Sequence, residues 1–417
     1  MEYMSRTLDL ELDDLLRGAP AIAIDGPKGV GKTGTAARRA RQVWLLDDPA
    51  QRERLRADFS LDTIALNGPV LFDEWQQLPQ VWDSVRRAVD RGAAPGRFLL
   101  TGSATPIDAS GTHSGAGRIL SLRMRPMGLH ERGMTRPTVS LGALLDGVGA
   151  DLGGTTDLTV PDYVQAIMDS GFPGALGLSQ RMRRSFLDSY LSRVIDRDLP
   201  DLGYEVRRPE TLRRWLAAYA AASSQTTAYS RLLDAATGGD GAQPAKTTTI
   251  VYRDHLSRLR LLDPVPGWMP ANSPFTTLRQ APKHQLADPA LAVRLLRLTE
   301  PGLMAPGGAG VLGHLFESLV TLGVRVMAQA ADATVSHLRT KAGGHEVDLI
   351  VESADGGVLG IEVKLAPVIE AADVRHLLWL RDRMPEKVVD LLVVTTGQAA
   401  YRRRDGVAVV PLALLGP

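Results

Sequence analysis

The sequence predicts an α/β protein with a parallel sheet near the N-terminus, a helical middle region and a second α/β region at the C-terminus. Three observations support this prediction. Short apolar runs alternate with helical patterns over the first 125 residues, helical periodicity continues through the middle, and strand patterns return over the last hundred residues. Short apolar runs separated by helices are typical of a parallel sheet that is buried on both faces.

The length and composition are those of a protein with several domains. The chain has 417 residues, which is too long for one ordinary core and suggests two or three domains. Hydrophobic residues make up 44% and charged residues 23%, as in soluble globular proteins. The formal net charge is +1, so a nucleic-acid contact would need a local basic patch.

The chain contains no cysteine. This excludes disulfides, cysteine nucleophiles and thiolate zinc sites, and it fits a cytoplasmic protein. The N-terminus is acidic and lacks a basic region followed by an apolar run, so we expect no signal peptide. The sequence has no run of about 18 apolar residues, so we expect neither a transmembrane helix nor a membrane partner.

Three apolar runs in the N-terminal region predict buried strands. They span residues 21–25, 70–73 and 98–101, and polar residues end each of them. In a parallel sheet these polar residues lie at the carboxyl edge, where such folds bind their ligands.

A phosphate-binding loop follows the first of these runs. Its residues are Gly26-Pro27-Lys28-Gly29-Val30-Gly31-Lys32-Thr33, with Gly34 next, and they match G-x-x-x-x-G-K-[ST] in full. Glycines let the backbone amides face phosphate oxygens, and the following helix points its positive end at them. We expect Lys32 to contact the β- and γ-phosphates of ATP, and Thr33 to bind Mg²⁺. The alternative, a chance glycine loop, does not explain the strand before it and the helix after it.

The second run ends in the carboxylates Asp73 and Glu74. Downstream of a phosphate loop, this pattern predicts Asp73 as the magnesium ligand and Glu74 as the residue that orients the attacking water. The alternative is an acidic pair that caps the helix beginning at Trp75.

The third run ends at Thr101-Gly102-Ser103. A hydroxyl here could sense the γ-phosphate, so we predict Ser103 as a catalytic residue, with a simple turn as the alternative. Arg97 and Arg118 flank the segment and are candidate arginine fingers, as are Arg193 and Arg197. Such fingers usually act between subunits, so we expect a homo-oligomer.

The middle of the chain predicts a winged helix. Residues 133–160 are glycine-rich and indicate a linker or insertion, and helical patterns follow. Helices at 210–223, 229–236 and 247–259, then a strand at 261–265, are the order of elements in a winged helix. We expect the exposed face and start of the third helix to bind DNA, through Lys246, Thr247, Thr248, Thr249, Tyr252 and Arg253. The alternative is a domain that only packs or contacts protein.

A cluster of charged residues lies in the C-terminal strand patterns. Glu362 and Lys364 share one strand face, and Asp348 comes from the strand before them across a turn at 353–357. Glu317 lies on a preceding helix, at 311–327. We predict that Glu317, Asp348 and Glu362 bind Mg²⁺ or Mn²⁺ and that Lys364 acts on the water or the developing charge. The alternative is an exposed hairpin of mixed charge, which the apolar flanks argue against.

The sequence resembles the bacterial and archaeal AAA-type ATPases that carry a C-terminal restriction-endonuclease-like domain of unknown function. The residues that carry the resemblance are Gly26–Thr33, Leu71–Gln76, Arg97–Ala104, Ser170–Pro173, Arg197-Asp198, Glu346–Asp348 and Gly360–Lys364. The resemblance implies an AAA-like core, a winged-helix middle and a PD-(D/E)xK tail in which Asp348, Glu362 and Lys364 match the D…ExK positions. Two features depart from the pattern: the long glycine-rich stretch at 133–160, and Gly34 in place of a second Ser or Thr.

These observations predict four regions. They are residues 1–130 (ATPase core), 131–205 (linker or insertion and helical lid), 206–290 (winged-helix-like) and 291–417 (nuclease-like). We expect an ATP-hydrolysing protein that acts on DNA, with a metal-dependent nuclease tail. The alternative is a nucleotide-dependent regulatory switch whose tail is a non-catalytic binding module. The protein partners of either are not predictable from the sequence.

Overall fold

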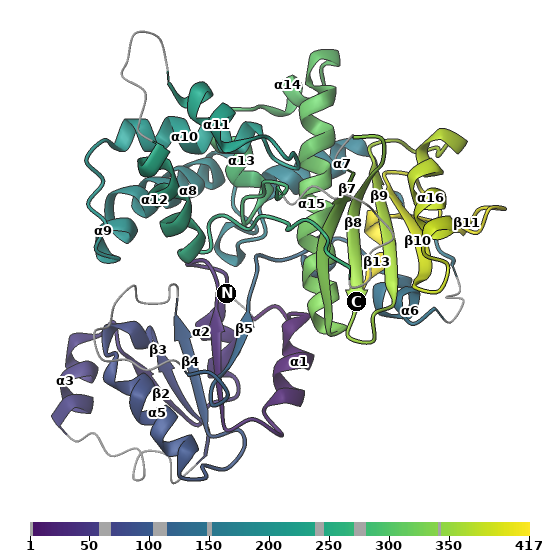
Figure 1. The fold of residues 1–417 in the computed structure, drawn as a ribbon. Helices are drawn as coiled ribbons and strands as arrows, with labels where there is room; N and C mark the ends of the chain where they lie inside the picture. Colours follow the sequence, from purple (N-terminus) through teal and green to yellow (C-terminus); the bar gives the residue numbers. More distant parts are fainter. Residues whose placement is uncertain are drawn as a thin grey trace.

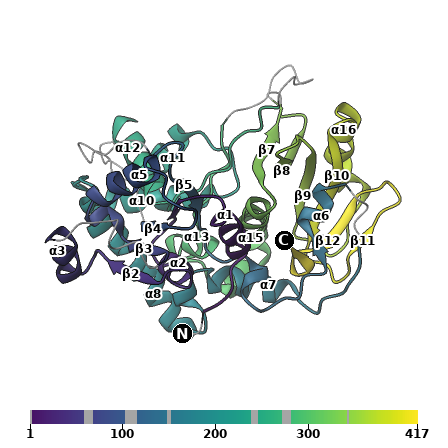
Figure 2. The ribbon, with the colours of Figure 1, turned by 90° about the horizontal axis from the view of Figure 1, so that it is seen from below.

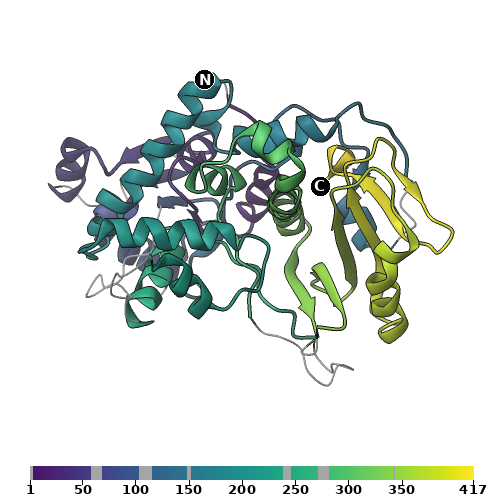
Figure 3. The ribbon, with the colours of Figure 1, turned by 90° about the horizontal axis from the view of Figure 1, so that it is seen from above.

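The computed structural model describes residues 3–57, 68–102, 115–147, 152–237, 246–270, 281–340 and 343–417. Figure 1 shows three regions: an N-terminal α/β domain in purple and blue, a helical middle in teal, and a C-terminal sheet in green and yellow. The long helix α15 (Ala309–Ala330) stands between the middle helices and the C-terminal sheet, as Figures 1 and 3 both show.

The N-terminal domain is a five-stranded parallel sheet in the order β2-β3-β4-β1-β5. Its strands are β1 (Ala21–Asp25), β2 (Gln42–Leu45), β3 (Val70–Asp73), β4 (Phe98–Gly102) and β5 (Leu120–Arg123). Its helices are α1 (Leu8–Leu15), α2 (Lys32–Ala37), α3 (Pro49–Ala57) and α5 (Gln80–Asp90).

Burial on both faces explains why three of these strands were predictable. Alternate residues of β1 enter two different apolar clusters, with Ile22 in one and Ala21 in the other. The predicted strands β1, β3 and β4 are confirmed. The edge strands β2 and β5 were not predicted, because each buries only one side chain, Trp44 in β2 and Leu122 in β5.

The middle region is helical. It contains α7 (Val160–Asp169), α8 (Gln180–Arg193), a π-helix (Val194–Asp198), α9 (Leu199–Asp201), α10 (Pro209–Ala221), α11 (Tyr229–Ala236), α12 (Lys246–Arg258) and α13 (Pro289–Leu295). The strand predicted at 261–265 forms only isolated antiparallel bridges, Leu262 with Leu286 and Val265 with Lys283. The three predicted helices are confirmed as α10, α11 and α12, and a short antiparallel ribbon follows them, so the winged helix stays a prediction.

The C-terminal region is a six-stranded mixed sheet in the order β11-β12-β10-β9-β8-β7. Its strands are β7 (Ala333–Arg339), β8 (Glu346–Ser353), β9 (Val358–Lys364), β10 (Val388–Thr395), β11 (Tyr401–Arg402) and β12 (Ala408–Pro411). Alternate residues of β8 separate the two faces: Leu349 packs in the cluster that contains α15, and Ile350 in the cluster that contains α16 (Arg375–Arg383). A helix therefore covers each face of the sheet.

Part of the segment predicted as a linker belongs to this C-terminal region. Strand β6 (Val139–Ser140) pairs with β13 (Leu415–Gly416), and α6 (Leu141–Leu145) packs against α15 and the sheet. Three leucines of α6 are buried, Leu141, Leu144 and Leu145. The glycines around α6 suggested a linker, but its leucines need an apolar partner and find one on the distant sheet.

Among the described residues, one segment is long and apolar enough to cross a membrane, by length and composition alone. It is Pro306–Ala330, which consists of α15 and the three residues before it. This contrasts with the expectation that no such stretch exists. Inside the protein, 72% of its most apolar window is buried. Helix α15 also packs beside α1, and Figure 2 shows the two helices side by side.

Candidate nucleotide site and a charged C-terminal cavity

The phosphate loop connects the end of β1 to the start of α2. Gly29 and Gly31 have φ values of +79° and +103°, a region that side chains with a Cβ rarely adopt. At Gly26 an added Cβ would lie 2.2 Å from the carbonyl oxygen of Met124. The three glycines are therefore required by the backbone path of this loop.

The Lys32 side chain lies folded into its own loop. Its ammonium donates hydrogen bonds to the carbonyl oxygens of Gly26 and Pro27, both at 3.0 Å. Burial lowers the pKa of Lys32, and the carboxylates of Glu74 and Asp73 act in the opposite direction. The loop thus contains a desolvated cation with two carboxylates close to it.

Asp73 connects the phosphate loop to two neighbouring strands. Its Oδ1 accepts a hydrogen bond from Thr33 Oγ1 at 2.8 Å and another from the hydroxyl of Thr101. Thr101 lies opposite Asp73 in the register of β3 and β4. A hydroxyl and a carboxylate oxygen side by side are the donors that Mg²⁺ takes in such loops, so Thr33 and Asp73 fit this ion.

Glu74 turns the chain sharply after β3. Its φ of +51° is in the left-handed region, which is costly for a residue with a side chain and often marks a functional site. It precedes a short 3-10 helix (Trp75–Gln77) but makes no capping hydrogen bond to it, so the helix-capping interpretation gains no support. Burial raises the pKa of Glu74, Lys32 counteracts this, and the Gln76 side-chain amide donates to the carboxylate.

The remaining predicted residues of this site are elsewhere or outside the described chain. Ser103 lies outside the described residues. Arg97 and Arg118 precede β4 and β5, so they lie at the opposite edge of the parallel sheet from the phosphate loop. Arg118 pairs there with Asp90 at 2.9 Å. Neither arginine can reach the nucleotide site of its own chain.

The middle region packs directly on the phosphate loop. Lys28 Nζ lies 2.5 Å from Asp198 Oδ1 in the π-helix, and Pro173 lies against Gly31. At the other end of the loop, Arg260 pairs with Asp25, the last residue of β1. These pairs were not predicted, although Ser170–Pro173 and Arg197-Asp198 are among the residues that carry the family resemblance.

A buried ion cluster connects all three regions. Asp263 lies 2.8 Å from Arg125 Nε, 2.9 Å from Arg325 Nη1 and 3.1 Å from Arg123 Nη2. Burial by itself would raise the pKa of Asp263, but the three guanidinium groups together hold it well below its usual range. Arg123 and Arg125 come from the end of β5 or just after it, Asp263 from the middle ribbon and Arg325 from α15. The cluster therefore fixes the relative position of the three regions.

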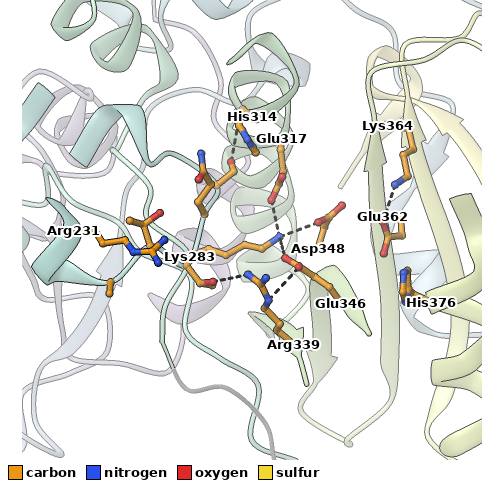
Figure 4. Close-up of a pocket in the computed structure, with 15 residues that line it drawn as sticks. Arg231, Lys283, His314, Glu317, Arg339, Glu346, Asp348, Glu362, Lys364 and His376 are labelled. Carbon is orange, nitrogen blue, oxygen red and sulfur yellow. Dashed lines mark hydrogen bonds and ion pairs between the residues drawn. The ribbon is translucent and has the colours of Figure 1, made fainter. Parts of the chain in front are cut away.

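A second site is a cavity of about 650 Å³ between the middle and C-terminal regions. Figure 4 shows the charged side chains that line it. They are Arg231, Lys283, His314, Glu317, Arg339, Glu346, Asp348, Glu362, Lys364 and His376.

Lys283, which the sequence analysis missed, lies at the centre of the acidic side of this cavity. It is 1% exposed, and its Nζ lies 2.8 Å from Glu317 Oε1, 2.9 Å from Asp348 Oδ1 and 3.5 Å from Glu346 Oε1. Burial raises the pKa of Glu317 to about 8, with Lys283 acting in the opposite direction. No motif in the sequence singles Lys283 out, because its partners come from α15 and β8.

Glu362 and Lys364 lie together on the far wall of the cavity. Lys364 Nζ is 3.3 Å from Glu362 Oε2, and the backbone amide of Val363 donates to Asp348 Oδ2 at 3.0 Å. Burial and the neighbouring Asp348 raise the pKa of Glu362 well above its usual value. In the described part of the chain, no group of three or more His, Cys, Asp or Glu side chains is arranged to hold a metal ion. Glu317, Asp348 and Glu362 nevertheless line the same cavity, so their assignment as metal ligands stays a prediction.

The predicted DNA-binding face of α12 is partly buried. Tyr252 and Thr249 are 4% and 7% exposed, so their assignment to an exposed face was wrong. Tyr252 packs edge-on against Trp215 of α10, because α12 turns this side towards the helical core. Arg253 lies over the Tyr229 ring and pairs with Asp254. Thr248 is half-buried, and the side chains of Lys246 and Thr247 lie outside the described part.

Three family models match successive parts of the chain. Residues 18–132 match an AAA domain, residues 160–302 a domain of unknown function (DUF8612) and residues 312–415 a second domain of unknown function (DUF4143). The match to the AAA domain, on a parallel sheet with a phosphate loop, identifies the N-terminal region as an AAA-type P-loop ATPase domain that binds ATP.

Curated relatives extend over most of the chain. Uncharacterized protein Rv2008c of Mycobacterium tuberculosis and Uncharacterized protein Mb2031c of Mycobacterium bovis are each 26% identical to it in an alignment 414 residues long. Each alignment covers 95% of this chain and 81% of the relative. Among solved structures, the Walker-type ATPase PABY2304 of Pyrococcus abyssi aligns with a TM-score of 0.40 at 16% identity, over 69% of this chain and 94% of its own.

Proposed function

We propose that this protein hydrolyses ATP at the phosphate loop of its AAA-type domain and that the bound nucleotide controls how the middle region packs on that domain. The observation that carries the proposal is the grouping of Lys32, Thr33, Asp73 and Glu74 at one edge of the sheet, where β1 and β3 end. This grouping contains four groups that hydrolysis of a phosphoanhydride uses: a cation, two metal donors and a carboxylate for the water.

Each of these residues has a separate task. Lys32 exchanges its two carbonyl partners for the β- and γ-phosphates of ATP, which are stronger acceptors. Thr33 and Asp73 hold Mg²⁺, which when bound neutralises phosphate charge. Glu74 orients the attacking water and accepts its proton. Its raised pKa makes it a better base than an exposed glutamate.

Two ion pairs connect the loop to the middle region. Lys28 is within the phosphate loop, so a bound triphosphate competes with Asp198 for its ammonium group. Arg260 holds Asp25, directly before the loop. Nucleotide binding therefore weakens one contact between the regions and leaves the other in place, which favours a rotation over a separation.

Substitution of two residues tests the proposal. Lys32→Ala should remove hydrolysis and weaken binding of a fluorescent ATP analogue, whereas Glu74→Gln should keep binding and lose turnover by about 10²-fold or more, measured as phosphate release. Asp355→Asn, at an exposed residue on the turn after β8, is the control and should change neither binding nor turnover. Normal turnover in Glu74→Gln would show that Glu74 does not activate the attacking water.

The finer function has two candidates. One is an ATPase that acts on DNA with a metal-dependent nuclease tail, which requires free carboxylates at Glu317, Asp348 and Glu362. The other is a nucleotide-dependent switch whose tail binds a partner without cutting DNA. The ion pairs between Lys283 and two of these carboxylates favour the second candidate. Metal-dependent nicking of plasmid DNA by the purified protein would favour the first.

A further inference from the structure

The position of Lys283 in the C-terminal cavity is unusual for a lysine. Its ammonium group is almost fully buried and lies between carboxylates from two elements, Glu317 on α15 and Asp348 on β8 (Figure 4). Buried ammonium groups are rare because desolvation is costly, and they persist where carboxylates surround them. Here the carboxylates were assembled around a lysine of the protein itself.

The carboxylates have few oxygens left for another cation. One oxygen of Asp348 faces Lys283 and the other accepts the amide of Val363. Glu317 Oε1 also faces Lys283, and Glu362 Oε2 pairs with Lys364 beside it on β9. A divalent ion needs several of these oxygens at once, and a positive ammonium beside it would repel it.

The backbone holds Lys283 in this position. Its amide and carbonyl form a reciprocal pair of hydrogen bonds with Val265, both at 2.9 Å. The next residue, His284, donates its amide to the carbonyl of Gln225 at 2.9 Å, and Gln285 accepts a hydrogen bond from the Ser318 hydroxyl at 2.6 Å. These bonds fix the backbone of Lys283 beside α15, within reach of Glu317 and Asp348.

We propose that Lys283 is a built-in cation that replaces a divalent metal, so the C-terminal cavity is a metal-independent site. A nuclease-like metal centre at Glu317, Asp348 and Glu362 does not fit this arrangement. The ammonium group neutralises the carboxylates of Glu317 and Asp348, as a metal ion would otherwise do. Its ion pairs also connect the middle region to α15 and to the C-terminal sheet. This inference concerns the tail alone and is independent of ATP hydrolysis.

Mn²⁺ binding without nucleotide tests the proposal. The free Mn²⁺ signal in electron paramagnetic resonance gives the number of ions bound per chain. Wild-type protein and Asp348→Asn should bind the same number, as should Asp355→Asn, an exposed acidic control on the turn after β8. A Mn²⁺ ion that wild-type protein binds and Asp348→Asn loses would overturn the proposal.

Removal of the lysine gives the opposite expectation. Lys283→Gln should bind one Mn²⁺ per chain more than the wild type, because one repelling charge is lost and two carboxylates are freed. The gain should disappear in Lys283→Gln with Asp348→Asn. A folded Lys283→Gln variant, checked by circular dichroism, that gains no Mn²⁺ would also overturn the proposal. If this variant does not fold, the comparison of wild type with Asp348→Asn decides.

Discussion

Substitution of Asp263 should loosen the junction of the three regions. In Asp263→Asn the buried carboxylate that balances Arg123, Arg125 and Arg325 becomes a neutral amide, while the three guanidinium groups stay. Removal of one partner from a buried ion pair typically costs about 3–5 kcal/mol. Arg325 keeps its 2.7 Å hydrogen bond to the carbonyl of residue 263, so we expect the lower end, about 3 kcal/mol.

Hydrogen exchange measures this loss where it occurs, which matters because a chain of several domains does not unfold as one unit. A local loss of about 3 kcal/mol corresponds to roughly 10²-fold faster exchange. In Asp263→Asn, the peptides that contain residues 120–126 and 261–266 should show this faster exchange. In the control variant Asp355→Asn, the same peptides should exchange as in the wild type. Unchanged exchange in both peptides of Asp263→Asn would refute the role of the cluster.

The pH dependence follows from the direction of the pKa shift. Because the pKa of Asp263 is lowered in the folded protein, its stabilising effect is complete above the unfolded-state value, about 3.9, and is lost as the pH falls towards the folded-state value. The difference in exchange between wild type and Asp263→Asn should therefore be constant near neutral pH and shrink below about pH 4. A second substitution, Arg325→Met, should restore part of the protection by removing one unbalanced charge.

Four further outcomes test the other assignments. Asp198→Asn should free Lys28 and tighten ATP binding by about two- to fivefold in a fluorescence titration, since Lys28 is partly exposed; no change would exclude the competition. If the site is completed between subunits, mixing Lys32→Ala with Arg118→Ala should restore some hydrolysis, whereas a specific rate that stays constant down to monomeric concentrations would contradict a homo-oligomer. If α12 binds DNA, Arg253→Ala should weaken binding in an anisotropy assay, with affinity falling as salt rises. Purified protein should hydrolyse ATP without nicking DNA in Mg²⁺ or Mn²⁺, and nicking that Glu362→Ala abolishes would re-establish a nuclease.

The sequence by itself determined the elements whose signal lies in consecutive residues. The phosphate loop is one, because its glycines set local backbone angles and its strand and helix follow directly along the chain. The strands β1, β3 and β4 are others, since burial on both faces leaves an uninterrupted apolar run. The predicted hairpin of β8 and β9 is also confirmed, with its turn at the expected residues.

Only the tertiary structure decided which distant residues meet. Lys283 and Asp263 are single charged residues without a local pattern, and each acquires its role from partners on α15 and on strands far along the chain. Tyr252 fits an exposed helix face in the sequence, yet the helical core covers it. The effect of a charge depends on its burial and on the charges around it, and an apolar face needs a surface to cover it. The burial of a charge and the cover of an apolar face both depend on contacts between segments that are far apart in the sequence, and no local pattern reveals these contacts.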